Sequence, residues 1–287
     1  MTSHLILRPA LWIAGVLSIA AAVSLSSQAA ETRIISAAPY EAELSGRTVA
    51  FLARDLETGI DFILDGSELQ QRHTPHSTFK IPNLLIALET GIAGSLDDHR
   101  VWDQEKRPVE PHWPAPWRQD QTLGEAFARS TVWYFQDLSL EIGTDAYRSK
   151  LSEWRYGNAD VAAGSDVFWL DGSLRISVNE QVTFLENLLE AALDIRSENI
   201  AALDQASLSG TEEGLTLHGK TGIGPDDFSN WDGAFSGWYV GYLRRENRAP
   251  VVFALHASGP SFSSIAAFRR PFALRLLTDA GLMPPMP

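Results

Sequence analysis

Strand-like sequence lies near both ends of the chain, and a long helical region separates the two parts. Two short β-rich runs, "TVAFLARD" and "IDFILD", are joined by "LETG", a connection of hairpin length. Strand-like runs return in the last third as "LTLHGKTG", "FSGWYVGYLR" and "VVFALHAS", followed by an amphipathic helix from about Ser263 to Ala280. This order predicts an α+β fold in which early and late strands pair in one antiparallel sheet flanked by helices. The helical middle would form a lobe, with a cleft between the lobe and the sheet.

The middle of the chain has helical spacing. From "STFK" through "IPNLLIALETG" the apolar residues recur at helical intervals, and Gly91 provides a natural end. Residues 92–120 are rich in proline and tryptophan, which predicts a long excursion with little regular structure. Helical patterns resume in "TLGEAFARS" and "DLSLEIGTDAYRSKLSEW", and Ser177 with Glu180 matches a capping box that starts a further helix.

The first thirty residues have the pattern of a secretory signal. Arg8 lies in a short polar start, an apolar run follows to about Leu25, and small residues precede a cleavage site before Ala30 or Glu31. The alternative is a retained membrane anchor, but the run is shorter than the roughly 20 residues that a span needs. We therefore expect residues 1–30 to be removed on export, leaving residues 31–287 as one domain that is free of the membrane.

Composition narrows the chemistry that the chain can use. The sequence contains no cysteine, which excludes disulfides, a thiol nucleophile and a thiolate metal site. The formal net charge of -13 leaves few cations to neutralise phosphates, so nucleic acid and anionic membrane surfaces are unfavourable partners. With 45% hydrophobic residues in a chain of 287, there are enough apolar side chains for a large core.

A serine and a lysine lie three residues apart where the first long helix is expected to begin. Ser77 and Lys80 in "STFK" would project from one face of a helical turn, so the amine can reach the hydroxyl. Lys80 is flanked by Phe79 and Ile81, and an apolar setting favours a neutral amine that could activate the serine. The alternative is two polar residues at an ordinary helix start. Lysine is scarce, however, and of the four in the chain only Lys80 has a serine three positions earlier.

The sequence "HGKTG" follows a strand-like run and contains a second unusual lysine. On an edge strand, Lys220 and Thr221 would present a cation and a hydroxyl to one carboxylate, and Gly219 and Gly222 would let the backbone approach closely. The alternative is a surface β-turn with a solvated lysine. The pairing of S-x-x-K with K-T-G is a signature of serine β-lactamases and penicillin-binding proteins, which strengthens both assignments.

Three further motifs lie between these two lysines: "STV" at residues 130–132, "YGN" at 156–158 and "FWL" at 168–170. With "STFK" and "KTG" they occur in the order and at the separations typical of class D, oxacillinase-type, serine β-lactamases, and "SDN" of class A enzymes is absent from the sequence. The chain resembles this family over nearly the whole of its mature part. The resemblance implies a β-lactamase and penicillin-binding transpeptidase-like fold, periplasmic location and hydrolysis of β-lactam antibiotics.

The resemblance also implies catalytic roles. Ser77 would open the β-lactam ring and carry the acyl group, and Lys80 would be carboxylated at Nζ by carbon dioxide and act as the general base. Only a neutral amine adds carbon dioxide, and an apolar pocket favours that form. Val132 would be the apolar neighbour of Lys80, and Ser130 would relay a proton to the leaving nitrogen. The indole N–H of Trp169 would steady the carbamate, although most indoles serve only packing.

The remaining site residues implied by the resemblance would bind the substrate: they are Lys220, Thr221, Gly222, Ile223 and Arg269. Lys220 and Thr221 would bind its carboxylate, and backbone N–H groups of Ser77 and Ile223 would form an oxyanion hole. Arg269 would be a second carboxylate-binding cation, because an arginine fork suits a planar carboxylate, with Arg270 as the open alternative. The "YGN" motif would form a wall of the site.

Two alternatives to a β-lactamase share the fold. A penicillin-binding D-Ala-D-Ala peptidase or a β-lactam sensor domain would be acylated without efficient turnover, and a scaffold protein would not react. The expected partner is a small-molecule β-lactam. We expect no metal and no cofactor other than carbon dioxide bound to Lys80, and the protein is expected to be a monomer or a homodimer. The chain departs from the simplest family pattern after "KTG" and in residues 106–118, and both segments should border the cleft, which leaves the range of substrates open.

Overall fold

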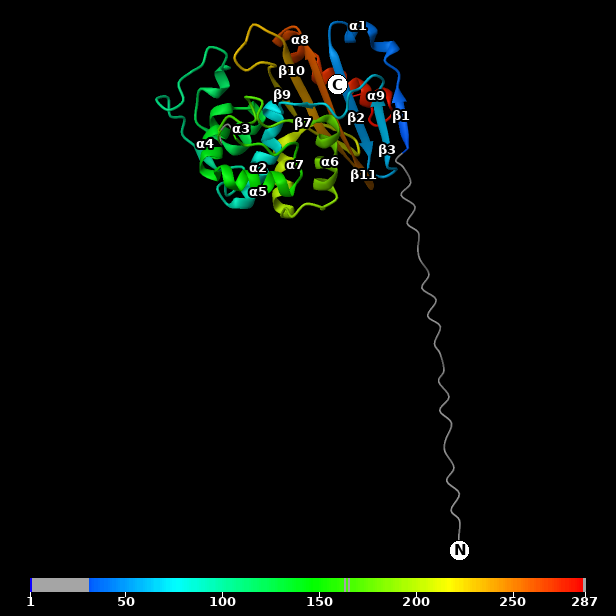
Figure 1. Cartoon of the computed structure of the whole chain (residues 1–287), viewed down its shortest axis with the longest axis horizontal. Helices are drawn as coiled ribbons and strands as arrows, with labels where there is room; N and C mark the ends of the chain where they lie inside the picture. The colour runs from blue at the N-terminus through cyan, green and yellow to red at the C-terminus, as the bar shows by residue number, and fades with distance from the viewer. Residues whose placement is uncertain (2–30, 163, 165, 286–287) are drawn as a thin grey trace.

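The computed structural model describes residues 1, 31–162, 164 and 166–285. Except for Met1, the signal peptide predicted for residues 1–30 therefore lies outside the described residues. The central sheet has the order β1-β3-β2-β11-β10-β9-β8 (Figure 1). Its strands are β1 (Thr32–Ile35), β2 (Thr48–Asp55), β3 (Ile60–Leu64), β8 (Leu208–Glu212), β9 (Leu215–Pro225), β10 (Phe235–Arg245) and β11 (Arg248–Gly259).

The early and late strands pair as predicted. Strands β2 and β3 form the antiparallel hairpin, and β2 also lies antiparallel to β11, with Leu52 opposite Ala254. Strands β9, β10 and β11 follow one another as antiparallel neighbours. The exception is β1, which runs parallel to β3 and makes the sheet mixed. The α+β prediction is therefore confirmed, with one parallel strand added at the edge.

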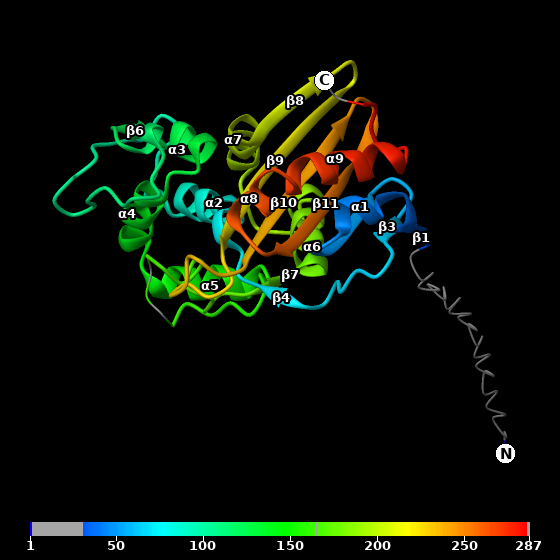
Figure 2. The ribbon, with the colours of Figure 1, turned by 90° about the horizontal axis from the view of Figure 1, so that it is seen from above.

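Both faces of the sheet are covered, so most residues of its central strands are buried. Neighbouring residues of β2 point to opposite faces: Leu52 belongs to the core shared with the helical lobe, and Phe51 belongs to the core on the other side. The second core is closed by α8 (Phe262–Ala266) and α9 (Arg269–Asp279), which lie over the strands in Figure 2.

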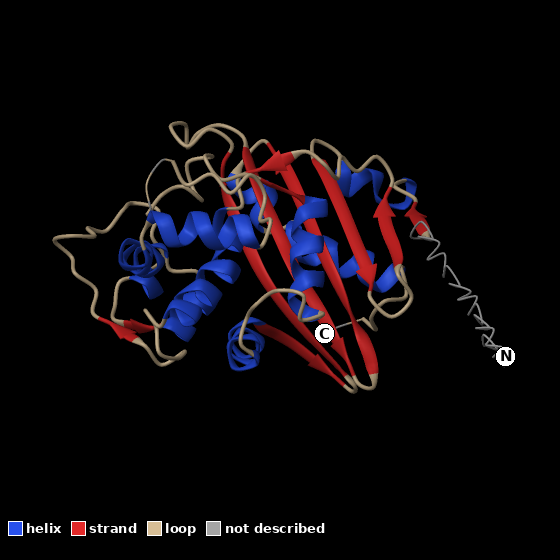
Figure 3. Cartoon of the chain, turned by 60° about the horizontal axis from the view of Figure 1, so that its bottom comes forward, coloured by secondary structure: helices blue, strands red, loops and turns tan. Residues whose placement is uncertain are grey.

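The helical lobe packs against the opposite face of the sheet and extends beyond one side of it (Figure 3). It follows the turn η2 (His76–Phe79) and contains α2 (Lys80–Thr90), α3 (Leu123–Arg129), α4 (Val132–Ile142), α5 (Thr144–Glu153), α6 (Val178–Leu189) and α7 (Ser197–Ser207). The remaining short elements are η1 (Ala38–Tyr40), α1 (Glu41–Leu44), η3 (Ala115–Trp117) and the pairs β4 (Arg72–His73) with β7 (Ile176–Ser177) and β5 (His99–Arg100) with β6 (Gln121–Thr122). Within the described ranges, every helix is too short or too polar to cross a bilayer.

Several helix boundaries agree with the sequence, and two do not. Gly91 ends α2 in the left-handed conformation (φ 71°), and Ser177 and Glu180 form the predicted capping box at the start of α6. The helical pattern of residues 137–154 is broken at Gly143, whose backbone (φ 80°, ψ 157°) lies outside the helical region. The single helix expected from Ser263 to Ala280 is also divided, because Pro271 is compatible with the first turn of a new helix but not with a helix interior.

Candidate active site

A cleft of about 920 Å³ opens between the helical lobe and one end of β9. Of the residues predicted to form the site, those on its surface are Ser77, Ser130, Val132, Thr221, Gly222, Ile223 and Arg269. The other three, Lys80, Trp169 and Lys220, are buried directly behind this surface. The structure thus gathers residues from η2, α2, α4, β9 and α9, together with the segment before α4, around one cavity.

The predicted Ser77 and Lys80 pair is in direct contact. Because they are three residues apart on one helical turn, Lys80 Nζ reaches Ser77 Oγ and donates a hydrogen bond of 2.9 Å. Lys80 is completely buried, and its Nζ lies 5.2 Å from the centre of the Phe135 ring. Among the described residues no carboxylate forms an ion pair with it. Burial, followed by the nearby Lys220 charge, lowers the pKa of Lys80 well below its usual value and favours the neutral amine.

Trp169 lies in the apolar shell beside this lysine. Its indole stacks on Phe79, the residue preceding Lys80, with ring centres 5.4 Å apart and an interplanar angle of 23°. The side chain is completely buried, and its Nε1 has no hydrogen-bond partner among the described residues. An unpartnered buried N–H costs about 1–3 kcal/mol, so this donor suits an acceptor that the protein itself does not supply.

A second serine and lysine pair faces the first. Lys220 Nζ donates to Ser130 Oγ at 3.0 Å and to the Thr221 carbonyl oxygen at 3.1 Å. Burial, and then the charge of Arg269, lowers the pKa of Lys220 to about 7. Ser130 itself has a left-handed backbone (φ 60°) at the end of α3, a conformation that is costly for serine and is found preferentially at functional sites. A pKa near 7 means that the charged and neutral forms of Lys220 are both accessible near neutral pH, in contact with Ser130.

The end of β9 that extends past its pairing with β8 forms one wall of the cleft. Strand β8 pairs only with residues 215–218 of β9, so within the described chain no strand covers that edge at residues 219–225. Gly222 approaches the turn η2 closely: a Cβ atom there would lie 2.8 Å from the Pro75 carbonyl oxygen and 3.2 Å from the Ser77 nitrogen. The absence of a side chain at Gly222 thus brings Ser77 beside the backbone of Ile223.

The structure distinguishes between the two candidate arginines. Arg269 lines the cleft, and its Nη1 donates to the Ala266 carbonyl oxygen at 2.7 Å. Its Nε has no partner among the described residues, and burial lowers its pKa to about 10, which leaves it cationic at neutral pH. Arg270 instead points away, toward the Tyr239 ring and the Ser209 carbonyl oxygen. Of the two, only Arg269 can meet a ligand in the cleft.

Comparison with known proteins agrees with this geometry. A model of the penicillin-binding protein transpeptidase domain matches residues 64–271. The probable β-lactamase YbxI of Bacillus subtilis is 33% identical over 246 residues, covering 84% of this chain and 88% of the relative. The β-lactamase OXA-20 of Pseudomonas aeruginosa is 36% identical over 225 residues, covering 78% of each chain. The chain belongs to the class D β-lactamases.

A solved structure adds a relative of a different kind. The C-terminal domain of the Bacillus licheniformis BlaR penicillin receptor superimposes with a TM-score of 0.78 and 29% identity, covering 90% of this chain and 99% of the receptor domain. The class D β-lactamase described here is therefore an enzyme whose fold is shared with a receptor for penicillin.

The mouth of the class D site is lined with aromatic residues. His112, from the proline-rich excursion, stacks on Trp231, from the segment after β9, with ring centres 4.4 Å apart and an interplanar angle of 25°. Both also line the cleft, as do Trp113 and Trp117. The two segments that depart from the simplest family pattern therefore meet over the cleft of this β-lactamase.

Some site residues of the β-lactamase could not be recognised from the sequence. Phe135 covers Lys80 and lies three residues after Val132 on α4, a spacing that could have indicated a shared face. His76, with a left-handed backbone (φ 49°), packs so tightly on β9 that a Cβ at Gly224 would lie 2.4 Å from its ring. In the predicted wall, Tyr156 is buried with its ring 6.0 Å from that of Phe79.

Proposed function

We propose that this enzyme hydrolyses β-lactam antibiotics through an acyl group on Ser77, with Lys80 carboxylated at Nζ as the general base, and that it confers antibiotic resistance. The observation that carries the proposal is the pocket around Lys80. A buried amine, whose lowered pKa favours the neutral form, lies 2.9 Å from Ser77 Oγ, and Trp169 supplies a buried N–H without a partner among the described residues. A carbamate would supply a base beside Ser77 and an acceptor for that N–H.

The residues of the pocket fit such a group. Carbon dioxide adds to a neutral amine, and burial of Lys80 favours that form. Val132 and Phe135 keep the surroundings apolar, which limits exchange with water. Trp169 would donate to the added carboxylate, and a hydrogen bond to a charged group contributes about 1.5–3 kcal/mol.

Acylation then requires two proton transfers. Ser77 Oγ attacks the lactam carbonyl carbon as its proton passes to the base at Lys80, and the backbone N–H groups of Ser77 and Ile223 stabilise the developing oxyanion. The carbon–nitrogen bond breaks as Ser130 Oγ gives its proton to the ring nitrogen. Lys220, whose pKa is about 7 and whose Nζ lies 3.0 Å from Ser130 Oγ, restores that proton. Before deacylation the base at Lys80 releases to solvent the proton that it took from Ser77, and Lys220 takes a proton up. The base then deprotonates a water molecule, which attacks the acyl carbonyl carbon, and Ser77 Oγ leaves with that proton.

The substrate would be oriented by its carboxylate. Thr221 and Arg269 both line the cleft, and a guanidinium fork can donate two parallel hydrogen bonds to a carboxylate. Serine β-lactamase chemistry of this kind needs no metal. The proposal further includes export, removal of residues 1–30, a periplasmic location, and action as a monomer or homodimer.

The likeness to the BlaR penicillin receptor favours one second candidate, a β-lactam sensor that is acylated without efficient turnover. Mass spectrometry after mixing with benzylpenicillin tests both functions. The β-lactamase proposal expects an acyl adduct on the peptide containing Ser77 that appears and then decays as hydrolysed product accumulates. A lasting adduct would favour the sensor, and the absence of an adduct in the wild type would refute both.

A further inference from the structure

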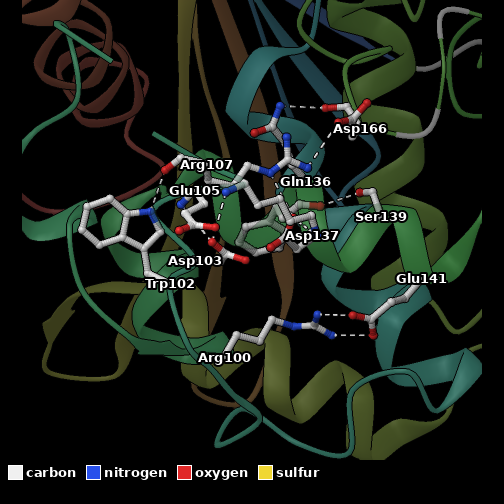
Figure 4. A network of polar contacts seen from close by, with 12 residues as sticks. Arg100, Trp102, Asp103, Glu105, Arg107, Gln136, Asp137, Ser139, Glu141 and Asp166 are labelled. Carbon is white, nitrogen blue, oxygen red and sulfur yellow. Dashed lines mark hydrogen bonds and ion pairs between the residues drawn. The ribbon is translucent and has the colours of Figure 1, made fainter. Parts of the chain in front are cut away.

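Two arginines tie the long excursion of residues 92–120 to α4 (Figure 4). Arg100 makes a two-pronged ion pair with Glu141 near the end of α4, with Nη1–Oε1 at 2.5 Å and Nη2–Oε2 at 3.0 Å. Arg107 instead lies between two carboxylates, with Nε–Oδ1 of Asp137 at 3.0 Å and Nη2–Oδ2 of Asp166 at 3.3 Å. Arg100 Nε also lies 3.8 Å from Asp98 Oδ1, which precedes β5. Of the two arginines, only Arg107 forms an ion pair with the segment that carries Trp169.

The second contact of Arg107 leads to the indole behind the nucleophile. Asp166 lies three residues before Trp169 in the same short segment. The segment is folded by backbone hydrogen bonds from Leu170 and Asp171 to the Val167 carbonyl oxygen, at 2.7 and 3.1 Å. A displacement of Asp166 would therefore be passed to the indole through a compact turn.

Helix α4 holds this segment at the same point. Gln136 Nε2 donates to the Asp166 carbonyl oxygen at 3.1 Å, so Asp166 is held through its backbone by α4 and through its side chain by Arg107. The same helix carries Phe135, whose ring centre lies 5.2 Å from Lys80 Nζ, and Val132, which lines the cleft. The network consequently fixes the Trp169 segment relative to the other wall of the Lys80 pocket.

The ion pairs of Arg107 are partly shielded from solvent. The exposed fractions of the Arg107, Asp137 and Asp166 side chains are 15%, 13% and 29%, so these ion pairs are less screened than those of a fully exposed surface. Lys106 Nζ also lies 3.0 Å from Asp137 Oδ1, so Asp137 keeps a cation if Arg107 is replaced. Asp166 has no second cation among the described residues. Replacing Arg107 should therefore leave Asp166 without an ion-pair partner, whereas Asp137 keeps its contact with Lys106.

We propose that Arg107 is a positioning residue that holds the Trp169 segment against α4 and thereby sets the affinity of Lys80 for carbon dioxide. This inference rests on the proposed carboxylation of Lys80. The ion pairs of Arg107 contact neither Ser77 nor Lys80, so their effect on the base passes through the Trp169 segment. Because Arg107 also lines the cleft, the same contact joins the substrate-binding rim to the pocket of the base.

The test compares Arg107→Gln with Arg100→Gln, a matched variant that loses an ion pair to α4 but makes no contact with Asp166. Carbamate formation is followed by ¹³C NMR with labelled bicarbonate, in the absence of any β-lactam. We expect Arg107→Gln to need about two- to tenfold more bicarbonate for half-maximal signal, the range that loss of one such contact produces. Arg100→Gln should titrate as the wild type does.

Two controls make the result decisive. Circular dichroism and thermal unfolding establish that each variant is folded, and Asp166→Asn, which keeps the side-chain volume, replaces Arg107→Gln if the latter is not. An unchanged bicarbonate titration in the variant, or an equal shift in Arg100→Gln, would overturn the inference while leaving the proposed function intact. Absence of a carbamate signal in the wild type would overturn both this inference and the proposed carboxylation of Lys80. Mass spectrometry after mixing with benzylpenicillin would then show whether acylation at Ser77 survives alone.

Discussion

Replacing Trp169 by phenylalanine should remove a hydrogen-bond donor from the Lys80 pocket while preserving most of its packing. The phenyl ring can keep the stack on Phe79, whose ring centre lies 5.4 Å from that of the indole. What is lost is the Nε1–H, which is buried and has no partner in the described part of the protein. If this donor serves a carbamate on Lys80, the variant should bind carbon dioxide more weakly.

The size of the effect follows from the type of bond. A hydrogen bond to a charged group contributes about 1.5–3 kcal/mol, which corresponds to about a ten- to hundredfold loss of affinity. At saturating bicarbonate the wild type should gain up to this much more in free energy of unfolding than the variant. Without carbon dioxide the wild type leaves the N–H unsatisfied, so the two proteins should differ less. Urea unfolding with and without bicarbonate measures both quantities, and stopped-flow kinetics should show deacylation slowed more than acylation.

Trp154 offers a matched control. It is also buried and also has an Nε1 without a partner among the described residues, but it packs against Phe184 rather than Phe79. Trp154→Phe should lose packing without changing the response to bicarbonate. If Trp169→Phe and the wild type gain equally from bicarbonate, or if Trp154→Phe shows the same loss, the role assigned to Trp169 is refuted.

Three further predictions concern the other wall of the cleft. Burial lowers the pKa of Lys220 from 10.5 to about 7, so between these pH values the unfolded chain binds one more proton than the folded protein. The free energy of unfolding should therefore rise with pH in this range, by about 1.4 kcal/mol per pH unit relative to Lys220→Met. Urea unfolding across this range checks the sign, and parallel pH curves would contradict it. Gly222→Ala should lower kcat/KM about a hundredfold, because its methyl group would meet Pro75; unchanged kinetics would exclude a close approach. Arg269→Gln should lower kcat/KM about tenfold or more and Arg270→Gln should have little effect; equal losses would reject the assignment of Arg269.

Much of the fold could be predicted because its signals are local. The hairpin of β2 and β3, the helix ending at Gly91 and the capping box at Ser177 each depend on residues close together in the sequence. Strands β1 and β8 were not predicted, because they are short and mostly exposed and so lack an alternating apolar pattern. The break between α8 and α9 was missed because Pro271 is tolerated in a first turn and cannot by itself show where a helix begins.

The residues of the site could be predicted from motifs, but most contacts between them could not. Spacing indicated that Lys80 could reach Ser77, since both lie on one helical turn. The contact between Lys220 and Ser130 joins residues 90 positions apart, and local spacing cannot establish it. The choice between Arg269 and Arg270 depends on which side of α9 faces the cleft. The contacts of Arg107 likewise depend on how an irregular excursion folds back onto α4.

Turnover of nitrocefin in large excess over the enzyme, with carbon dioxide first removed and bicarbonate then restored, tests the central claim most directly. We predict sustained hydrolysis over many equivalents, a fall in rate when carbon dioxide is removed, recovery with bicarbonate, and no turnover by Ser77→Ala. Hydrolysis of a single equivalent would contradict the assignment as an efficient β-lactamase. Sustained turnover that is indifferent to bicarbonate would contradict carboxylated Lys80 as the base.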